Sequence, residues 1–187
     1  MGELPEGSSS FSFCLDLSLG ITSMLTLQCT QKLLKELNTE LSPIKDTDPI
    51  ALWHANLLML DRRKCVLFTN DATRYSFLVP GLKKPDFKVL GQVFLDNLFR
   101  CMRIDDIEQN GIEKVLNACS RACFTKTSSR SVLGTMKEVT GLIECIIQDE
   151  GGLQNADMGA LNVEVNRMPC GPLGYDRPVK RFRALLA

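Results

Sequence analysis

The stretch from Trp53 to Val79 constrains the fold more than any other part of the chain, because three short apolar runs alternate there with polar residues. In residues 53–60 one alternating set of side chains is wholly apolar and the other starts polar, as in a strand packed on one face and partly covered on the other. Residues 65–69 are apolar on both faces and residues 74–79 alternate again. Charged residues 61–64 and Asx-rich residues 70–73 are typical of connecting turns. The sequence therefore predicts a three-stranded antiparallel meander that needs helices to cover it.

Further elements flank the meander. Short alternating runs predict strands at residues 25–29 and 122–127. Apolar residues at helical spacing, preceded by capping residues, predict helices from residue 31, over 86–101, after the Asp105-Asp106 pair, over 132–146 and over 157–165. The predicted fold class is α+β, a small antiparallel meander sheet covered by four or five helices. One core is expected to contain Trp53, Leu57, Phe68, Phe94, Val139 and Ile143.

Three regions are expected along the chain. Residues 1–23 have no capped periodic element and form an N-terminal extension, either disordered or lying before a true start at Met24. Residues 24–168 form a single α+β domain. Residues 169–187 contain recurring Pro and Gly and several basic residues, which predicts a loosely docked tail.

Cysteine and charge usage exclude some classes of protein. Eight cysteines occur without any C-x-x-C spacing, which favours a reduced, cytoplasmic protein that uses cysteine as a small core residue. One His and scattered cysteines do not form a metal-ligand set, so we expect no metal and no cofactor. No run reaches the about 20 apolar residues of a membrane span. The formal net charge is zero, so a general attraction to nucleic acid or membrane does not follow.

Three stretches carry a resemblance to known proteins: WHANLLMLDRRKCVLFTNDATRYSFLV, FTKTSSRSVLGTMKE and GGLQNADMGALNVEVNRMP. They resemble a family of small uncharacterised bacterial proteins catalogued as a domain of unknown function, over roughly residues 24–168. The resemblance supports the fold prediction and implies a bacterial origin. It brings no established reaction, ligand or partner.

A catalytic hypothesis rests on His54, Asn56 and Asp61, together with the hydroxyl-rich loop at residues 125–131. His54 and Asn56 share one face of the predicted strand, where the imidazole is placed to act as a general base. The alternative is a hydrogen-bonded structural histidine, which we favour because no nucleophile stands at a known spacing. A small hydrolase or nuclease-like enzyme is therefore an alternative, and the sequence favours a non-enzymatic role.

Two charged regions predict partners instead. Arg62, Arg63, Lys126 and Arg130 come from distant segments, and a shared face would bind nucleic acid or another polyanion. Residues 125–131 precede a helix, whose N-terminus favours an anion, although Ser128 or Ser129 acting as a simple cap explains the same residues. Residues 138–165 hold six acidic residues and no base. This charge supports the alternative hypothesis, a protein-binding module whose partner is basic. The leading hypothesis is a bacterial interaction protein that binds a polyanion.

Overall fold

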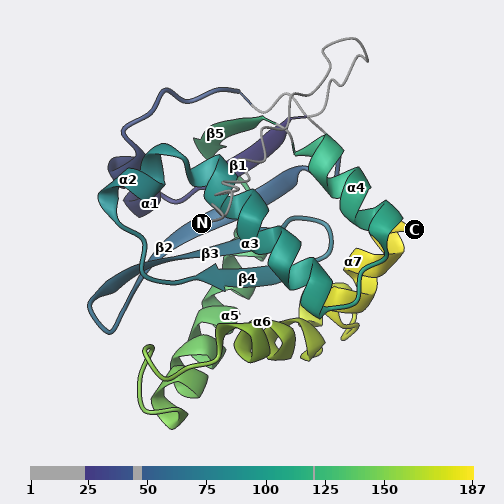
Figure 1. Cartoon of the computed structure of the whole chain (residues 1–187). Helices are drawn as coiled ribbons and strands as arrows, with labels where there is room; N and C mark the ends of the chain where they lie inside the picture. The colour runs from purple at the N-terminus through teal and green to yellow at the C-terminus, as the bar shows by residue number, and fades with distance from the viewer. Residues whose placement is uncertain (1–23, 44–47, 120) are drawn as a thin grey trace, which may run out of the picture.

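The computed structural model describes residues 24–43, 48–119 and 121–187. Five strands form one sheet in the order β4-β3-β2-β1-β5 (Figure 1). The strands are β1 (Leu25–Cys29), β2 (Leu52–Leu60), β3 (Arg63–Asn70), β4 (Ser76–Val79) and β5 (Ala122–Lys126). The expectation for residues 1–23 lies outside the described residues.

The sheet is mixed, so the prediction of a purely antiparallel meander is wrong for two of its strands. β2, β3 and β4 follow one another antiparallel, as the sequence predicts. β1 instead runs parallel to both β2 and β5. The physical reason is the length of the connections: short turns join antiparallel neighbours, whereas parallel neighbours need a crossover, which here contains helices. The α+β class is confirmed.

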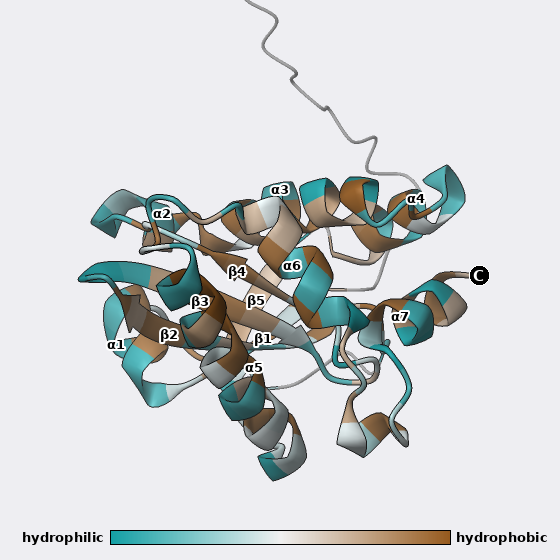
Figure 2. Ribbon diagram, turned by 90° about the horizontal axis from the view of Figure 1, so that it is seen from below, coloured by the Kyte–Doolittle hydropathy of each residue, from teal (hydrophilic) through white to brown (hydrophobic). Residues whose placement is uncertain are grey.

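Helices cover both faces of the sheet. In the described ranges they are α1 (Gln31–Leu37), α2 (Lys84–Lys88), α3 (Leu90–Ile104), α4 (Gln109–Ala118), α5 (Arg130–Asp149), α6 (Met158–Arg167) and α7 (Pro178–Leu186). Residues of α1, α2, α3, α4 and α7 pack on one face, and those of α5 and α6 on the other. Figure 2, which shows the molecule of Figure 1 from below, places α5 and α6 in front of largely hydrophobic strands. None of these helices combines the length and apolar content that crossing a lipid bilayer requires.

The protein has two hydrophobic cores, which corrects the expectation of one. Trp53, Phe68 and Phe94 meet on the first face, with the Trp53 ring 5.0 Å from that of Phe94 and the Phe68 ring 5.1 Å from it. Ile143 and Val139 belong to the cluster on the opposite face. Successive side chains of a strand point to opposite faces of the sheet. Because helices cover both faces, the apolar side chains on the two faces form two separate cores.

The C-terminal segment is an integral element and not the loosely docked tail expected from residues 169–187. Phe182 of α7 is completely buried, and its ring stacks on Tyr75 at 4.4 Å. Pro178 occupies the first turn of this helix, where its missing N–H has no cost. The Pro- and Gly-rich segment before α7 is thus followed by a helix that completes the first core.

The start of α4 also differs from the sequence prediction. The helix begins at Gln109 with Glu108 at its N-cap, so the Asp105-Asp106 pair does not cap it. The Asp105 carboxylate is buried and accepts a hydrogen bond from the Tyr75 hydroxyl at 2.5 Å.

Two asparagines of α6 bond to the outer edge of β4. The side-chain amide of Asn166 bonds both the N–H and the C=O of Ser76, each at 2.7 Å. That of Asn162 bonds the N–H of Leu78 at 2.8 Å and its C=O at 3.3 Å. β4 is the terminal strand of the sheet, and these amides satisfy backbone groups that no further strand pairs with.

Candidate functional site

A row of buried polar side chains crosses the second face of the sheet. In the strand register Gln28 lies beside His54, His54 beside Thr69, and Thr69 beside Ser76. All four are at most 1% exposed. Apolar residues flank Gln28, His54 and Ser76, and Phe68 precedes Thr69, so the row arises from the alternation of four strands.

A chain of hydrogen bonds runs from this row to the loop before α5. His54 Nδ1 lies 2.6 Å from Asp71 Oδ1. The Gln28 amide donates to Asp71 Oδ2 at 2.7 Å, and the Ser128 hydroxyl donates to Gln28 Oε1 at 2.5 Å. Asp71 follows β3 directly and reaches His54 because β2 and β3 are paired. The pair resembles an oriented general base, since a carboxylate bound at Nδ1 leaves Nε2 to act.

This histidine is nevertheless closed off from solvent. His54 is 0% exposed, and its Nε2 has no hydrogen-bond partner among the described residues. A substrate therefore has no route to Nε2 in this conformation. The other catalytic candidates are also bound elsewhere: Asn56 accepts a hydrogen bond from the Thr30 hydroxyl at 3.0 Å.

Asp61 is far from His54. The two residues are seven positions apart along an extended strand and its turn, a distance of about 20 Å. Asp61 lies in the β2–β3 hairpin with φ +45°, and its carboxylate accepts the Leu153 N–H at 2.6 Å. A Cβ on Gly152 would lie 3.1 Å from the same carboxylate, so the contact favours glycine there. Asp61 anchors the loop after α5 to the hairpin.

The four basic candidates divide between the two ends of α5. Lys126 and Arg130 are exposed at its beginning, and Arg62 and Arg63 are exposed in the hairpin held by Asp61 near its end. A helix of 20 residues is about 30 Å long. Ser129 caps α5 by accepting the Val132 N–H at 3.3 Å. The positions therefore do not form one continuous group.

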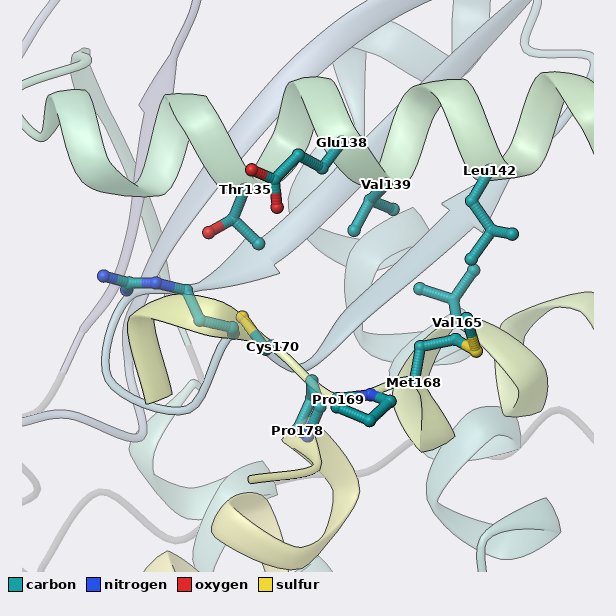
Figure 3. A pocket seen from close by; sticks show the side chains of 10 residues that line it. Thr135, Glu138, Val139, Leu142, Val165, Met168, Pro169, Cys170 and Pro178 are labelled. Carbon is teal, nitrogen blue, oxygen red and sulfur yellow. The ribbon is translucent and has the colours of Figure 1, made fainter. Parts of the chain in front are cut away.

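An open cavity of about 210 Å³ lies between α5 and the segment after α6, and sequence reasoning missed it (Figure 3). Its lining includes Arg74, Thr135 and Glu138 at a polar end. It also includes the apolar residues Val139, Leu142, Val165, Met168, Pro169 and Pro178, and the Cys170 thiol. The sequence offered one signal for this cavity, namely Arg74, a charged residue directly before a strand. The other lining residues come from distant segments, so their spacing in the sequence does not show that they meet.

The Cys170 thiol is not an activated nucleophile. Burial raises its pKa, and the nearby Glu138 carboxylate raises it as well. Thr135, the Leu173 backbone and Arg74 lower the pKa but offset only part of the effect of burial. The thiol therefore stays protonated and acts as a small, weakly polar wall of the cavity.

A second open cavity, of about 410 Å³, lies at the end of α5 beside the hairpin. We call it the acidic–apolar cleft; it is lined by Met59, Leu60, Asp61, Glu144, Ile147, Gln148, Gly151 and Gly152. Met59 is 58% exposed although it is a large apolar residue. In the described part of the chain, no group of three or more His, Cys, Asp or Glu side chains is arranged to hold a metal ion.

A family model described as a domain of unknown function, DUF6933, matches residues 26–181. This range includes the three stretches that carried the resemblance and extends into α7, beyond residue 168. No curated protein and no solved structure matches the chain.

Proposed function

The chain belongs to the DUF6933 family, and we propose that it is a non-catalytic protein-binding module that receives a basic, amphipathic segment of a partner at the acidic–apolar cleft. This proposal gives the acidic segment at residues 138–165 a function and a location. Cytoplasmic residence stays a prediction, supported by the free thiols of Cys29, Cys65, Cys101, Cys123, Cys145 and Cys170.

The observation that carries the proposal is the charge at the end of α5. A helix C-terminus has a partial negative charge, so basic residues stabilise it and acidic residues destabilise it. The last turn of α5 has no basic residue, and Asp149 is its last residue. Glu144 is exposed one to two turns earlier and has no ion pair among the described residues. This arrangement opposes folding stability, and a basic partner would neutralise it.

The apolar part of the cleft defines the partner further. Met59 is exposed beside Leu60 and Ile147, and a flexible methionine adapts to varied apolar side chains. A segment that presents an apolar residue to Met59 and a lysine or arginine to Glu144 matches both features. The aliphatic stem of a basic residue also packs on apolar surface while its charge stays at the acid.

The alternatives have weaker support. The hydrolase hypothesis requires that a substrate reach His54, which is completely buried. The polyanion hypothesis requires one face that holds all four basic candidates, and α5 separates them into two pairs: Arg62 with Arg63, and Lys126 with Arg130. Polyanion binding stays a prediction: affinity for a mixed RNA and DNA pool should fall steeply with salt, and negligible binding at low salt would remove it.

Two model peptides test the proposal directly. One is an amphipathic helix of leucine and lysine, and the other has the same leucine pattern with every lysine replaced by glutamate. We expect the lysine peptide to bind at least about tenfold more tightly, a difference of about 1.4 kcal/mol. Fluorescence anisotropy of the labelled peptides measures both affinities, and the preference should weaken as salt screens the charges.

Charge reversal at the cleft identifies the surface. The double variant Glu144→Lys/Asp149→Lys should lose the preference for the lysine peptide, while its stability stays equal or rises, because Asp149→Lys now favours the helix dipole by about 0.3–1 kcal/mol. The matched control is Glu113→Lys, an exposed reversal on α4, which packs on the opposite face of the sheet. Equal binding of the two peptides, or an unchanged preference in the double variant, contradicts the proposal.

A further inference from the structure

We propose that the cavity between α5 and the segment from Met168 to Pro178 binds a small zwitterion, namely a free amino acid with an apolar side chain. Its carboxylate would lie at Arg74, its ammonium group at Glu138 and its side chain against the apolar wall. This site shares no residue with the acidic–apolar cleft, so it is independent of the protein-binding proposal.

Arg74 supplies the positive end of the cavity. Its Nη2 donates to the Ser131 hydroxyl at 3.2 Å, whereas Nε and Nη1 are buried and have no acceptor among the described residues. A buried donor without an acceptor costs about 1–3 kcal/mol. A carboxylate bound at Nε and Nη1 would supply the missing acceptor.

The backbone at Arg74 supports a role beyond the fold. Its φ is +59°, in the left-handed region that glycine and asparagine adopt more readily than arginine. Arg74 therefore occupies a position where another residue would be less strained. Strain of this kind is found disproportionately at ligand sites, where the side chain and not the backbone is needed.

Glu138 supplies the negative end. It is exposed and has no hydrogen bond or ion pair within the described ranges. Ser131, which holds Arg74, and Glu138 are seven residues apart on α5, or about 10 Å along the helix axis. Two opposite charges that line one cavity and do not pair with each other match a ligand that carries both signs. A simple anion or cation would meet one charge of its own sign.

The rest of the cavity selects for an apolar body. Figure 3 shows Thr135 and Glu138 toward one end of the cavity, and Leu142, Val165 and Met168 gathered at the other. The cavity holds about 210 Å³, less than the about 300–1,000 Å³ of pockets for drug-sized ligands. A single amino acid of leucine size suits this volume and the order of positive, negative and apolar groups along the cavity.

Isothermal titration calorimetry with three probes tests the chemistry on the wild-type protein. L-leucine has both charges, L-leucinamide lacks the carboxylate and N-acetyl-L-leucine lacks the ammonium group. We expect L-leucine to bind, and each modified probe to bind about ten- to a hundredfold more weakly, as for the loss of one charged hydrogen bond. Absence of L-leucine binding, or equal affinity for all three probes, overturns the proposal.

Variants then assign each charge to one end of the ligand. Arg74→Asn, which keeps a residue suited to positive φ, should weaken L-leucine binding but leave the weak binding of L-leucinamide unchanged. Glu138→Gln should weaken L-leucine binding and leave that of N-acetyl-L-leucine unchanged. Glu113→Gln, the same change at an exposed position of α4 outside both cavities, is the matched control and should bind L-leucine as the wild type does.

Stability separates a binding role from a structural one. Arg74→Asn should unfold at the wild-type denaturant midpoint or above it, because the strain at Arg74 is relieved. A variant that loses stability together with binding would make Arg74 a structural residue, and binding of L-leucine that none of these variants changes would place the site elsewhere. Either result overturns the assignment.

Discussion

The buried residue Asp105 connects several parts of the first core. Its carboxyl group accepts a hydrogen bond from the Tyr75 hydroxyl, and its backbone carbonyl accepts one from the Arg183 guanidinium of α7. Its Oδ1 has no partner among the described residues. Burial raises the pKa of Asp105 above its ordinary 3.8, and Tyr75 and Arg183 lower it only in part. The neutral form of this carboxyl group is therefore more favoured in the folded state than in the unfolded chain.

The raised pKa of Asp105 predicts how stability changes with pH. The folded state binds this proton more tightly than the unfolded state, so the contribution to stability is full below pH 3.8 and is lost as the pH rises through the folded-state pKa. Asp105→Asn keeps an acceptor for Tyr75 and removes the charge. We expect its urea midpoint to equal or exceed that of the wild type at neutral pH, and to converge with it below pH 3.8. A much lower midpoint at neutral pH would show that the ionised carboxylate stabilises the fold.

Phe94 gives a second prediction at this scale. It is completely buried against Trp53 and Phe68, so Phe94→Ala should cost about 3–5 kcal/mol through lost burial and the cavity that remains. Phe99 is on the same helix but is 42% exposed, and Phe99→Ala should cost under about 1 kcal/mol. Equal denaturant midpoints for the two variants would contradict the packing of α3 on the sheet.

At the scale of elements, helix α5 depends on one cap. Ser129→Ala removes the acceptor of the Val132 N–H and should cost about 1 kcal/mol. Ser129→Asp should retain most of the stability, because aspartate also caps and its charge favours the helix N-terminus. Chemical denaturation of the three proteins measures this, and an alanine variant as stable as the wild type would mean that the cap is unimportant.

The elements also show which parts of the fold the sequence predicts. Alternation and turn residues are local, so they placed β2, β3 and β4 correctly, and the same holds for α5 and α6. Strand direction depends on how a connection crosses the sheet, which local patterns do not show, so the antiparallel prediction was wrong for β1 and β5. Phe182 lies in a segment with weak local signals, and the burial of α7 residues such as Val179, Phe182 and Leu186 in the first core explains why α7 forms.

The candidate sites were less predictable than the fold. The pairing of His54 with Asp71 follows from the register of β2 and β3, which the sequence does not state. The cavity at Arg74 combines a turn, one side of α5 and the chain after α6, and the approach of these segments is fixed only by packing. For the same reason, closeness in sequence was a poor guide to distance in space for residues of catalytic types, as His54 and Asp61 show.

At the scale of the whole molecule, the two faces of the sheet differ in character. The first face holds the aromatic cluster and the Asp105–Tyr75 contact, and the second holds the buried polar row and, around α5, both proposed binding sites. Changes to exposed residues around α5 should therefore alter binding with little effect on the aromatic core, because separate sites contribute nearly additively.

The asparagines of α6 have a consequence for self-association. A carboxamide offers the same donor and acceptor as a peptide group, so Asn162 and Asn166 stand in for an absent neighbouring strand. An uncovered terminal strand is a template on which another chain adds, and polymers of sheets grow from such edges. We therefore expect the pair to prevent β4 from pairing with the sheet edge of another molecule.

Asn162→Leu/Asn166→Leu should therefore form soluble oligomers or thioflavin-positive aggregates on mild heating, at temperatures where the wild type stays monodisperse by light scattering. The exposed neighbour Glu164 provides the comparison, since Glu164→Leu adds similar apolar surface to α6 and leaves both amides in place. Aggregation of both variants to the same extent would attribute the effect to hydrophobicity alone. Aggregation of the double variant only would mean that two side-chain amides on a helix protect this sheet from polymerisation.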